Sequence, residues 1–508
     1  MVVFRGKAPM PIRARTGTGA HHARNMDMSR TVTRAAAALA ALTVVRLFVA
    51  ALIPLSPDEA YYWIWSRALA AGYLDHPPMV ALWIRAGTAI AGSNPLGVRL
   101  FGPFSAVLGS LLLHDAADRL FPGRNAGLIA AALLNATLAL GVGAVIMTPD
   151  TPLLLFWTAT LWAAARLASG GLPAWWIAAG MFTGLALLSK YTAVFLPLGL
   201  ALYILIVNLA WLRRREPWLG GLVAAVLFSP VVIWNARHEW VGFLRQGDRV
   251  ADWRPERALQ YLAELVGGQL GLATPGVAVL FVAGLLIAIR MSARSRDPAW
   301  SLLAALSVPP GLVFLQHALG DRVQGNWPAI LYPAAAVAAS GLTDLVWRRL
   351  IWPSCGLGIA IAAVVYAHVV SGWPALGARD PVARQLFGWE DLARQAEAAR
   401  QAAGADFIAA EPYGLAAELA WTLPPDIEIV GAGKHWVPFA LPRVETSQMQ
   451  GILIRPERYG DAPDPRDWHD ATRFSEFTRS SSGGELERYA VFRVRIDGPF
   501  SGAVLPHR

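Results

Sequence analysis

The chain has 508 residues, of which 55% are hydrophobic and only 16% are charged. A soluble protein of this length could not bury so much apolar surface, so the composition predicts a membrane protein. The net charge of +9 does not indicate nucleic-acid binding, because the arginines lie in short clusters between apolar stretches, as they do in membrane-protein loops. The single cysteine, Cys355, excludes an internal disulfide and a cysteine-based metal site.

The first 32 residues are polar and rich in arginine, and they predict a disordered cytoplasmic leader. An alternative is that Met26 or Met28 is the true initiator. A cleaved signal peptide is not indicated, because the first apolar run lacks an evident small-residue cleavage site.

Apolar runs of spanning or near-spanning length follow the leader and predict about eleven transmembrane helices. Arginines fall in every second loop, which makes those loops cytoplasmic by the positive-inside rule. The pattern therefore predicts an all-α polytopic membrane protein with its N-terminus in the cytoplasm and its C-terminus outside. The predicted runs are 33–54, 97–113, 126–146, 151–168, 173–189, 191–211, 217–235, 270–289, 299–317, 328–346 and 351–371.

From about residue 372 the composition becomes charged and is punctuated by glycine and proline. A helix at 379–403 and the β-rich runs FIAAE, IEIVG, GILIRP and YAVFRVRI predict a small α/β domain. This domain is too polar to span the membrane, so we expect it in the periplasm. The predicted organisation is a leader (1–32), a transmembrane domain (33–371) and a periplasmic domain (372–508).

The outer loop at 55–96 carries acidic and aromatic residues directly after the first span. Asp58, Glu59 and Asp75 are the catalytic candidates, because a carboxylate at the membrane surface can take a proton from an acceptor hydroxyl. Tyr61 and Tyr62 are pocket-lining candidates, since rings beside carboxylates suit both sugars and lipid interfaces. The alternative is that acidic residues simply populate an outer loop, where they are common.

Two further charged residues flank apolar helices on the same predicted side. Asp150 follows the third span. Two roles are expected for it, capping of the next helix and lining of a site, and one residue can fill both. Lys190 is the one charge in about forty residues, at a surface where topology does not favour a cation. It either snorkels to the interface or binds an anion such as a phosphate.

The outer loop at 236–269 is unusually basic. His238, Arg245 and Arg249 are candidates for binding the phosphate of a lipid carrier, because guanidinium groups bind phosphate with two hydrogen bonds. The alternatives are pairing with acidic residues of the same loop or contact with anionic headgroups. Near the tenth span, Asn326 and Trp327 are pocket-lining candidates.

The motifs PDEAYYWIWS, YLDHPP, TPDTPLLLFW, GLALLSKYTAVFLPL and NWPA occur in this order, and AEPYGLAAELAWTLP follows in the polar C-terminal part. With these motifs the chain resembles the dolichyl-phosphate-mannose protein mannosyltransferase superfamily, in particular its bacterial branch, which includes the lipid A aminoarabinose transferases. The resemblance covers most of residues 33–430, and no single motif is decisive. It implies a GT-C fold in the bacterial inner membrane, with an outward-facing cavity and a polyprenyl-phosphate sugar as donor.

The resemblance also implies roles for individual residues. Asp58 matches the first-loop aspartate, the main catalytic or metal-associated carboxylate of the superfamily. Asp75 and His76 stand where the aminoarabinose branch has a Glu-Lys pair, a departure that puts phosphate binding by His76 in doubt. Asp150 and Lys190 match a carboxylate and a lysine that line the donor cavity. The residues near positions facing the carrier phosphate are His238 and Arg245.

The predicted function is transfer of a sugar from a polyprenyl-phosphate carrier to a lipid or polysaccharide acceptor of the lipopolysaccharide or lipid A type. Lys190 and Arg245, with Arg249 or a metal, would stabilise the leaving phosphate. Asp58 would act as base on the acceptor hydroxyl or orient it, and a single displacement would invert the anomeric centre. No cofactor is certain, and a divalent metal is left open.

Three other functions remain as alternatives. A transporter or flippase of a lipid-linked sugar would place charges near the middle of the bilayer and show inverted repeats, neither of which dominates this sequence. A protein O-mannosyltransferase would use a protein hydroxyl as acceptor. An assembly scaffold would tolerate the loss of its outer-loop carboxylates.

Overall fold

The structure, a computed structural model, describes residues 18–248, 253–444, 449–460, 462–496, 500 and 502–508. The chain divides into two compact units, Met1–Val45 and Arg46–Arg508. The boundary falls within the first helix, α1 (Thr18–Leu52). The predicted leader therefore overlaps α1 from Thr18 onward, and its first 17 residues lie outside the described residues. Every contact discussed below lies within the second unit.

Within the described residues, six helical segments are long and apolar enough to cross a membrane by length and composition. The number and the length of these segments confirm the prediction of a mostly helical, multi-pass membrane protein. Shorter apolar helices accompany the six segments. The long segments are Arg30–Leu52 in α1, Pro95–Leu120 (α4, Pro95–Arg99, and α5, Phe101–Leu120), α11 (Arg215–Arg237), α14 (Pro275–Ser295), α15 (Pro298–His317) and α17 (Leu345–Ser371); the shorter ones are α3 (Met79–Ala91), α6 (Ala126–Asn135), α9 (Trp175–Leu187), η1 with α10 (Tyr191–Val194 and Phe195–Val207) and η4 with α16 (Trp327–Leu331 and Tyr332–Ser340).

The remaining helices before the C-terminal domain connect these segments. The predicted span at 126–146 is interrupted after α6, because the side chain of Thr137 accepts a hydrogen bond from the backbone N–H of Leu140 at 3.2 Å and so starts a new helix, α7. The predicted loops at 55–96 and 236–269 also contain helices. These helices are α2 (Pro57–Arg67), α7 (Leu138–Gly143), α8 (Asp150–Ala168), η2 (Leu209–Arg213), α12 (Val241–Asp248), η3 (Pro255–Arg257) and α13 (Ala258–Leu272). Of these, α8 is part of the packed helical body, between α5 and α9.

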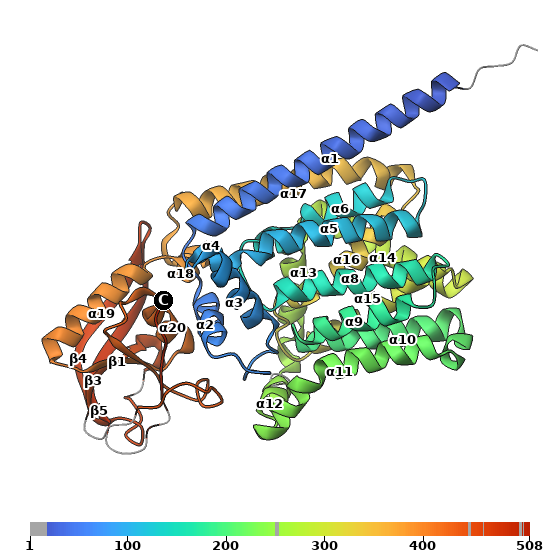
Figure 1. The fold of residues 1–508 in the computed structure, drawn as a ribbon. Coiled ribbons are helices and arrows are strands. Elements are labelled where there is room, and N and C mark those ends of the chain that lie inside the picture. The colour runs from blue at the N-terminus through green and yellow to red at the C-terminus, as the bar shows by residue number, and fades with distance from the viewer. Residues whose placement is uncertain (1–17, 249–252, 445–448, 461, 497–499, 501) are drawn as a thin grey trace, which may run out of the picture. The chain divides into compact units, whose positions relative to one another are not determined.

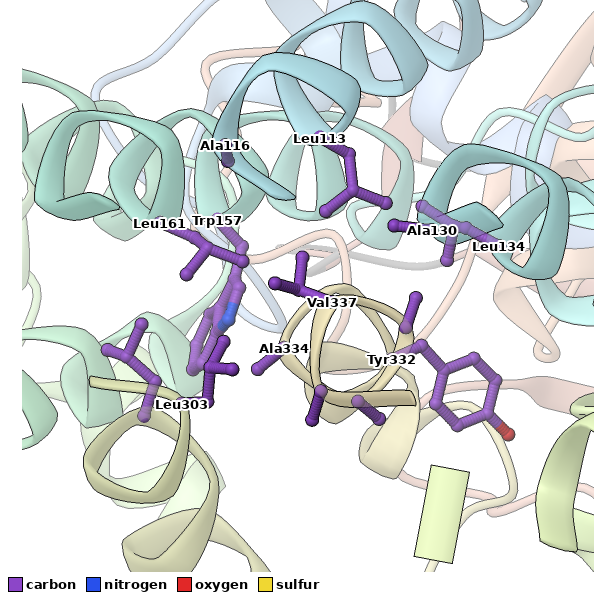
Figure 2. Packing of buried hydrophobic residues seen from close by; sticks show 14 of the residues in the cluster. Leu113, Ala116, Ala130, Leu134, Trp157, Leu161, Leu303, Tyr332, Ala334 and Val337 are labelled. Atoms are coloured by element: carbon purple, nitrogen blue, oxygen red, sulfur yellow. The ribbon is translucent and has the colours of Figure 1, made fainter. Parts of the chain in front are cut away.

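The centre of the helical body is the short helix α16. All nine of its residues are buried, and it packs against α5, α6, α8, α14 and α15. Figure 2 shows Ala334 and Val337 of α16 surrounded by Leu113, Trp157 and Leu303 from three of these neighbours. Small side chains let helices approach closely, and this close approach is the main source of packing energy between helices in a membrane. On one side of this core α5, α8, α9 and α11 lie side by side in that order (Figure 1).

The C-terminal part forms a six-stranded mixed sheet in the order β4-β5-β3-β1-β2-β6. β1 pairs in parallel with β2 and β3, and the other pairs are antiparallel. The four predicted β-rich runs correspond to β1, β2, β3 and β5, whereas β4 is too polar to stand out in the sequence. The strands are β1 (Phe407–Ala410), β2 (Glu428–Gly431), β3 (Met449–Pro456), β4 (His469–Ser481), β5 (Gly484–Ile496) and β6 (Ala503–Val504).

The helix predicted at 379–403 is two helices in the structure. The side chain of Asp380 caps α18 (Pro381–Leu386), and Gly388, with φ of 83°, separates it from α19 (Trp389–Ala403). A positive φ is readily adopted only by glycine, so the break is encoded locally. α19 packs against β1, β3 and β4, and the third helix, α20 (Tyr413–Thr422), packs against β1, β2 and also α2. Short 3-10 turns, η5 (Gly377–Arg379) and η6 (Glu457–Tyr459), complete the domain.

A fully buried ion pair joins the end of α1 to α2 and α4. The guanidinium group of Arg99 donates to both carboxylate oxygens of Glu59 at 2.6 Å. It also donates to the backbone carbonyls of Ala50, Ile53 and Pro54 at 3.1, 2.7 and 2.7 Å. Buried charges are tolerated when their partners satisfy them in this way. Arg99 therefore fixes the turn that leads into α2.

Arg99→Met should lower the melting temperature of the detergent-solubilised protein, because it leaves the carboxylate of Glu59 buried without its cation, at a cost of about 3–5 kcal/mol. Thermal unfolding followed by tryptophan fluorescence measures the change. Arg394→Met is the matched control, since the side chains of Arg394 and Asp391 are 77% and 48% exposed and such a pair contributes at most about 1 kcal/mol. Equal melting temperatures for the two variants would show that the buried pair is not a main anchor.

Candidate active site

Asp58 and Glu59, adjacent at the start of α2, point in different directions. The side chain of Ser56 accepts from the backbone N–H of Glu59 at 3.4 Å, and the carboxylate of Glu59 accepts from the backbone N–H of Ser56 at 3.0 Å. Successive side chains on a helix point about 100° apart. The contacts that turn Glu59 inward to Arg99 therefore leave Asp58 facing a cavity. Glu59, a predicted catalytic candidate, is fully buried and lies outside the cavity lining.

The carboxylate of Asp58 is accessible from the cavity but closely surrounded by protein. The hydroxyl group of Tyr413 donates a hydrogen bond to its Oδ1 at 2.9 Å. Loss of hydration raises the pKa of Asp58, and the negative charges of Asp75 and Glu59 raise it further, while the hydrogen bond from Tyr413 opposes the shift. A carboxylate whose pKa lies above its ordinary value is better suited to accept a proton near neutral pH.

Asp75 lies between an aromatic cluster and a cation. The hydroxyl of Tyr61 is 3.5 Å from its Oδ2, and Nε of Arg245 is 3.5 Å from its Oδ1. The neighbouring His76 faces the ring of Tyr62, with 6.3 Å between ring centroids. The structure thus brings together predicted residues from the first outer loop and from α12.

The hydroxyl of Tyr62 lies within electrostatic reach of three carboxylates of the site. Its ring is buried in α2. Burial raises the pKa of its hydroxyl, and the negative charges of Asp58, Asp75 and Asp150 raise it further. Three predicted carboxylates from different parts of the chain therefore act electrostatically on one tyrosine.

Asp150, Lys190 and Asn326 form a second polar cluster. The ammonium group of Lys190 donates to the two carboxylate oxygens of Asp150 at 2.7 and 2.8 Å, and the amide of Asn326 donates to Oδ2 at 2.7 Å. Asp150 is the first residue of α8, and Lys190 follows the end of α9. The side chain of Lys190 is only 7% exposed, so it does not snorkel. Its charge is balanced by a carboxylate within the protein.

A cavity of about 500 Å³ joins the two clusters. Asp58, Asp150 and Asn326 line it, and most of the other lining residues are apolar; they come from several helices, including α5, α7, α8, α17 and α18. Along α8 the lining extends from Asp150 to Thr158, which at 1.5 Å per residue corresponds to about 12 Å into the helical body. Such a cavity has carboxylates at one end and an apolar interior, and it suits a lipid with a polar head.

A second cavity, of about 170 Å³, lies beside Lys190, the cation of the second polar cluster. Lys190, Tyr191, Gln246, His317 and Trp327 are among its lining residues. Asp150 lines the larger cavity and Lys190 the smaller one, so their ion pair lies between the two. Breaking or turning this pair would expose the ammonium group to the contents of either cavity.

The remaining predicted residues lie away from the cavities or outside the described part of the chain. His238 ends α11, where its ring stacks on Trp234 at 4.2 Å and Nδ1 lies 2.8 Å from the carbonyl of the same residue. The ring of Tyr61 is buried within aromatic residues. Arg249 lies outside the described residues.

Sequence patterns did not identify Tyr413 and His435, which belong to the C-terminal domain. Their rings lie 4.4 and 6.3 Å from that of Tyr61, and 4.7 Å from each other. Burial lowers the pKa of His435; Asp75 opposes this effect, and Arg245 adds to it. The one available signal was the motif AEPYGLAAELAWTLP, which contains Tyr413 but does not indicate its partner.

The site offers little support for a divalent metal. Among the described residues, no group of three or more histidine, cysteine, aspartate or glutamate side chains is arranged to hold an ion. Asp150 already has a cation, Lys190, on both oxygens.

Residues 75–234 match the sequence profile of the dolichyl-phosphate-mannose-protein mannosyltransferases. This part of the chain is therefore similar to that family. The match contains the Asp75, Asp150 and Lys190 positions, and Asp58 lies before its start. A relative, the lipid A galacturonosyltransferase RgtD of Rhizobium johnstonii, is 29% identical over 373 residues, which are 72% of this chain and 77% of the relative.

Solved structures with the same fold cover nearly the whole chain. ArnT from Cupriavidus metallidurans in the apo state has a TM-score of 0.61 and 17% identity, and the match covers 92% of this chain and 98% of ArnT. The structure of the same protein bound to undecaprenyl phosphate has a TM-score of 0.61 and 15% identity, with the same coverage. At this identity the likeness shows a shared fold, including the C-terminal domain.

A double-variant cycle tests the Asp150–Lys190 pair. Asp150→Asn should destabilise the protein by about 1–3 kcal/mol, because it leaves the buried ammonium group without a counter-charge. Adding Lys190→Met should restore part of this loss, since the unpaired charge is then removed. Melting temperatures of the two single variants and the double variant in detergent give the coupling. Strictly additive effects would mean that the two charges do not stabilise each other.

Proposed function

We propose that this protein is a membrane glycosyltransferase that moves a sugar from a polyprenyl-phosphate carrier to a lipid A-type acceptor. The observation that carries the proposal is the cavity that Asp58 and Asp150 line together with mainly apolar side chains of the helical body and of α18. The profile match over residues 75–234 supports the reaction class. The relative RgtD, whose match covers 72% of this chain, is named as a lipid A galacturonosyltransferase. A structure of ArnT, which has this fold, contains bound undecaprenyl phosphate.

The reaction follows from the charges around the cavity. Asp58 accepts the proton of the acceptor hydroxyl as that oxygen attacks the anomeric carbon. The bond between this carbon and the phosphate oxygen breaks, and the electron pair leaves with the polyprenyl phosphate. Lys190 and Arg245 stabilise the negative charge that develops there. A single displacement of this kind inverts the anomeric centre.

The acceptor and the sugar follow from the relatives. A lipid acceptor is favoured over a protein hydroxyl, because the long match is to a lipid A transferase. Galacturonic acid is the sugar that this relative's name specifies, and we propose an acidic sugar of this kind for the present protein. Arg245 and Lys434 supply positive charge beside the site, and the charges of both lower the pKa of His435.

We place the N-terminus in the cytoplasm and the C-terminal domain (372–508) in the periplasm, on either side of a transmembrane domain of about eleven helices (33–371). The contact between Asp150 and Lys190 and the cavity shared by Asp58 and Asp150 support a common side for the three residues. Two of the three alternatives, a transporter and a scaffold, do not require this convergence of a carboxylate and a cation on an apolar cavity.

Asp58→Asn should abolish sugar transfer, with a loss of about 10²–10⁴-fold, because the amide cannot act as a base. The assay uses purified protein in nanodiscs with a polyprenyl-phosphate galacturonic acid donor and lipid A, and mass spectrometry detects the lipid with one added hexuronic acid. Asp391→Asn, which makes the same chemical change on the exposed face of α19, is the control and should retain full activity. Full activity of Asp58→Asn would rule out its role, and no transfer by the wild type to lipid A would rule out the acceptor.

Cysteine labelling tests the orientation. Cys355 is buried and is the single cysteine, so Cys355→Ala provides a background without thiols. In spheroplasts, a membrane-impermeant maleimide should label Arg322→Cys, which lies in the proposed periplasmic loop. It should label Ser295→Cys only after the membrane is permeabilised, because this position lies in a proposed cytoplasmic loop. The opposite labelling pattern would reverse the topology.

A further inference from the structure

The C-terminal domain reaches the candidate base through one residue. Tyr413 is the first residue of α20, and its hydroxyl donates to Oδ1 of Asp58 at 2.9 Å, across 355 positions of sequence. No motif in the first outer loop or in the C-terminal domain indicates this contact. It is the direct polar link between the sheet domain and the acidic end of the cavity that the described residues reveal.

Packing fixes the position of Tyr413 relative to α2. A Cβ atom on Gly414 would lie 2.7 Å from Cβ of Pro57, so glycine allows the start of α20 to press against the start of α2. The ring of Tyr413 is held between Tyr61, at 4.4 Å, and His435, at 4.7 Å. The hydroxyl therefore has little freedom to leave Asp58.

The opposite side of α2 is equally constrained. Glu59, the next residue after Asp58, is fully buried against Arg99 and also accepts from the backbone N–H of Met147 at 2.9 Å. The backbone of Asp58 is thus held from within the helical body, and its carboxylate is held from the C-terminal domain. Asp58 is therefore held in two ways: through the backbone next to Glu59 and through the hydrogen bond from Tyr413.

We propose that Tyr413 is a positioning residue that holds the carboxylate of Asp58 in the orientation and the ionised state needed to deprotonate the acceptor. This inference rests on the proposed function, because it assumes that Asp58 is the base. The C-terminal domain is then part of the catalytic machinery and not an appended module. Oδ1 takes the hydrogen bond from Tyr413, and Oδ2 takes the proton of the acceptor hydroxyl.

The surrounding charges explain why such a donor is needed. Loss of hydration favours the protonated form of Asp58 most strongly, and the negative charges of Asp75 and Glu59 add to this effect. The groups acting on Tyr413 are Asp58, Asp75 and Arg245; burial and the two carboxylates raise the pKa of its hydroxyl, which stays protonated as a donor. The hydrogen bond from Tyr413 to the ionised carboxylate opposes the loss of hydration and the repulsion, both of which raise the pKa of Asp58.

Tyr413→Phe keeps the ring and removes the hydroxyl, so it tests the inference with little disturbance of packing. Without the hydrogen bond the pKa of Asp58 rises further, and the base is protonated over a wider range of acidic pH. The acid limb of the kcat/KM profile should therefore move to higher pH by about one unit. Binding of polyprenyl phosphate, measured by quenching of tryptophan fluorescence, should stay unchanged, because Tyr413 acts through Asp58.

Tyr489→Phe is the matched control. Tyr489 is a buried tyrosine of the same domain whose hydroxyl also donates to a carboxylate, that of Glu487, at 2.6 Å. Its pH profile should follow the wild type. A melting temperature for Tyr413→Phe near that of Tyr489→Phe would show that the folded state is retained.

The outcomes separate this inference from the proposed function. An active wild type, an inactive Asp58→Asn variant and a shifted acid limb in Tyr413→Phe support both. With the first two results in place, an unmoved acid limb would overturn the role of Tyr413 alone, as would loss of polyprenyl-phosphate binding in Tyr413→Phe. Full activity of Asp58→Asn would instead overturn the role of Asp58, and with it the premise of the inference.

Discussion

The buried pair of Arg99 and Glu59 is the interaction on which the arrangement of the site depends. Besides the carbonyls at the end of α1, the pair engages the backbone N–H of Met147, three residues before Asp150. One ion pair therefore ties together the chain segments that carry Asp58 and Asp150. Removing two charges from water is costly, and the cost is offset here because both carboxylate oxygens and the guanidinium group have several partners.

The charges of the cavity act as a set because an apolar environment surrounds them. Lys190 and Asp150 balance each other at one end of a cavity lined mainly by aliphatic side chains. In such surroundings each charge exerts a stronger field than it would in water. A lipid phosphate entering either cavity would compete with Asp150 for the ammonium group, so binding of the donor and rearrangement of the pair are physically coupled.

The aromatic cluster around Tyr61 joins the C-terminal domain to the helical body. Tyr61 contacts Tyr413, His435 and Trp436, all from the sheet domain. Aromatic rings bury large areas at low cost in conformational freedom, and each of these pairs adds a geometric preference. The same rings fix the hydroxyl of Tyr413 and leave Asp58 accessible from the cavity. Domain packing and site geometry thus depend on one group of side chains.

The amino-acid sequence alone determined the class of protein and much of its local structure. The length of the apolar runs predicted the helical membrane body, and the β-rich runs predicted four of the six described strands. The ordered motifs from YLDHPP to GLALLSKYTAVFLPL indicated a resemblance to the mannosyltransferase family, which the profile match over residues 75–234 bears out. These features are local, because hydrophobic period and motif order depend on neighbouring residues. The roles of the predicted site residues stay predictions.

Only the tertiary structure decided which residues meet. Adjacent Asp58 and Glu59 look equivalent in the sequence, and the partner of each, Tyr413 or Arg99, is what separates an accessible carboxylate from a buried anchor. Lys190 could have snorkelled to water, but its ion pair with Asp150 crosses 40 positions. Such contacts are set by how helices and domains pack, and packing depends on side chains that no local window contains.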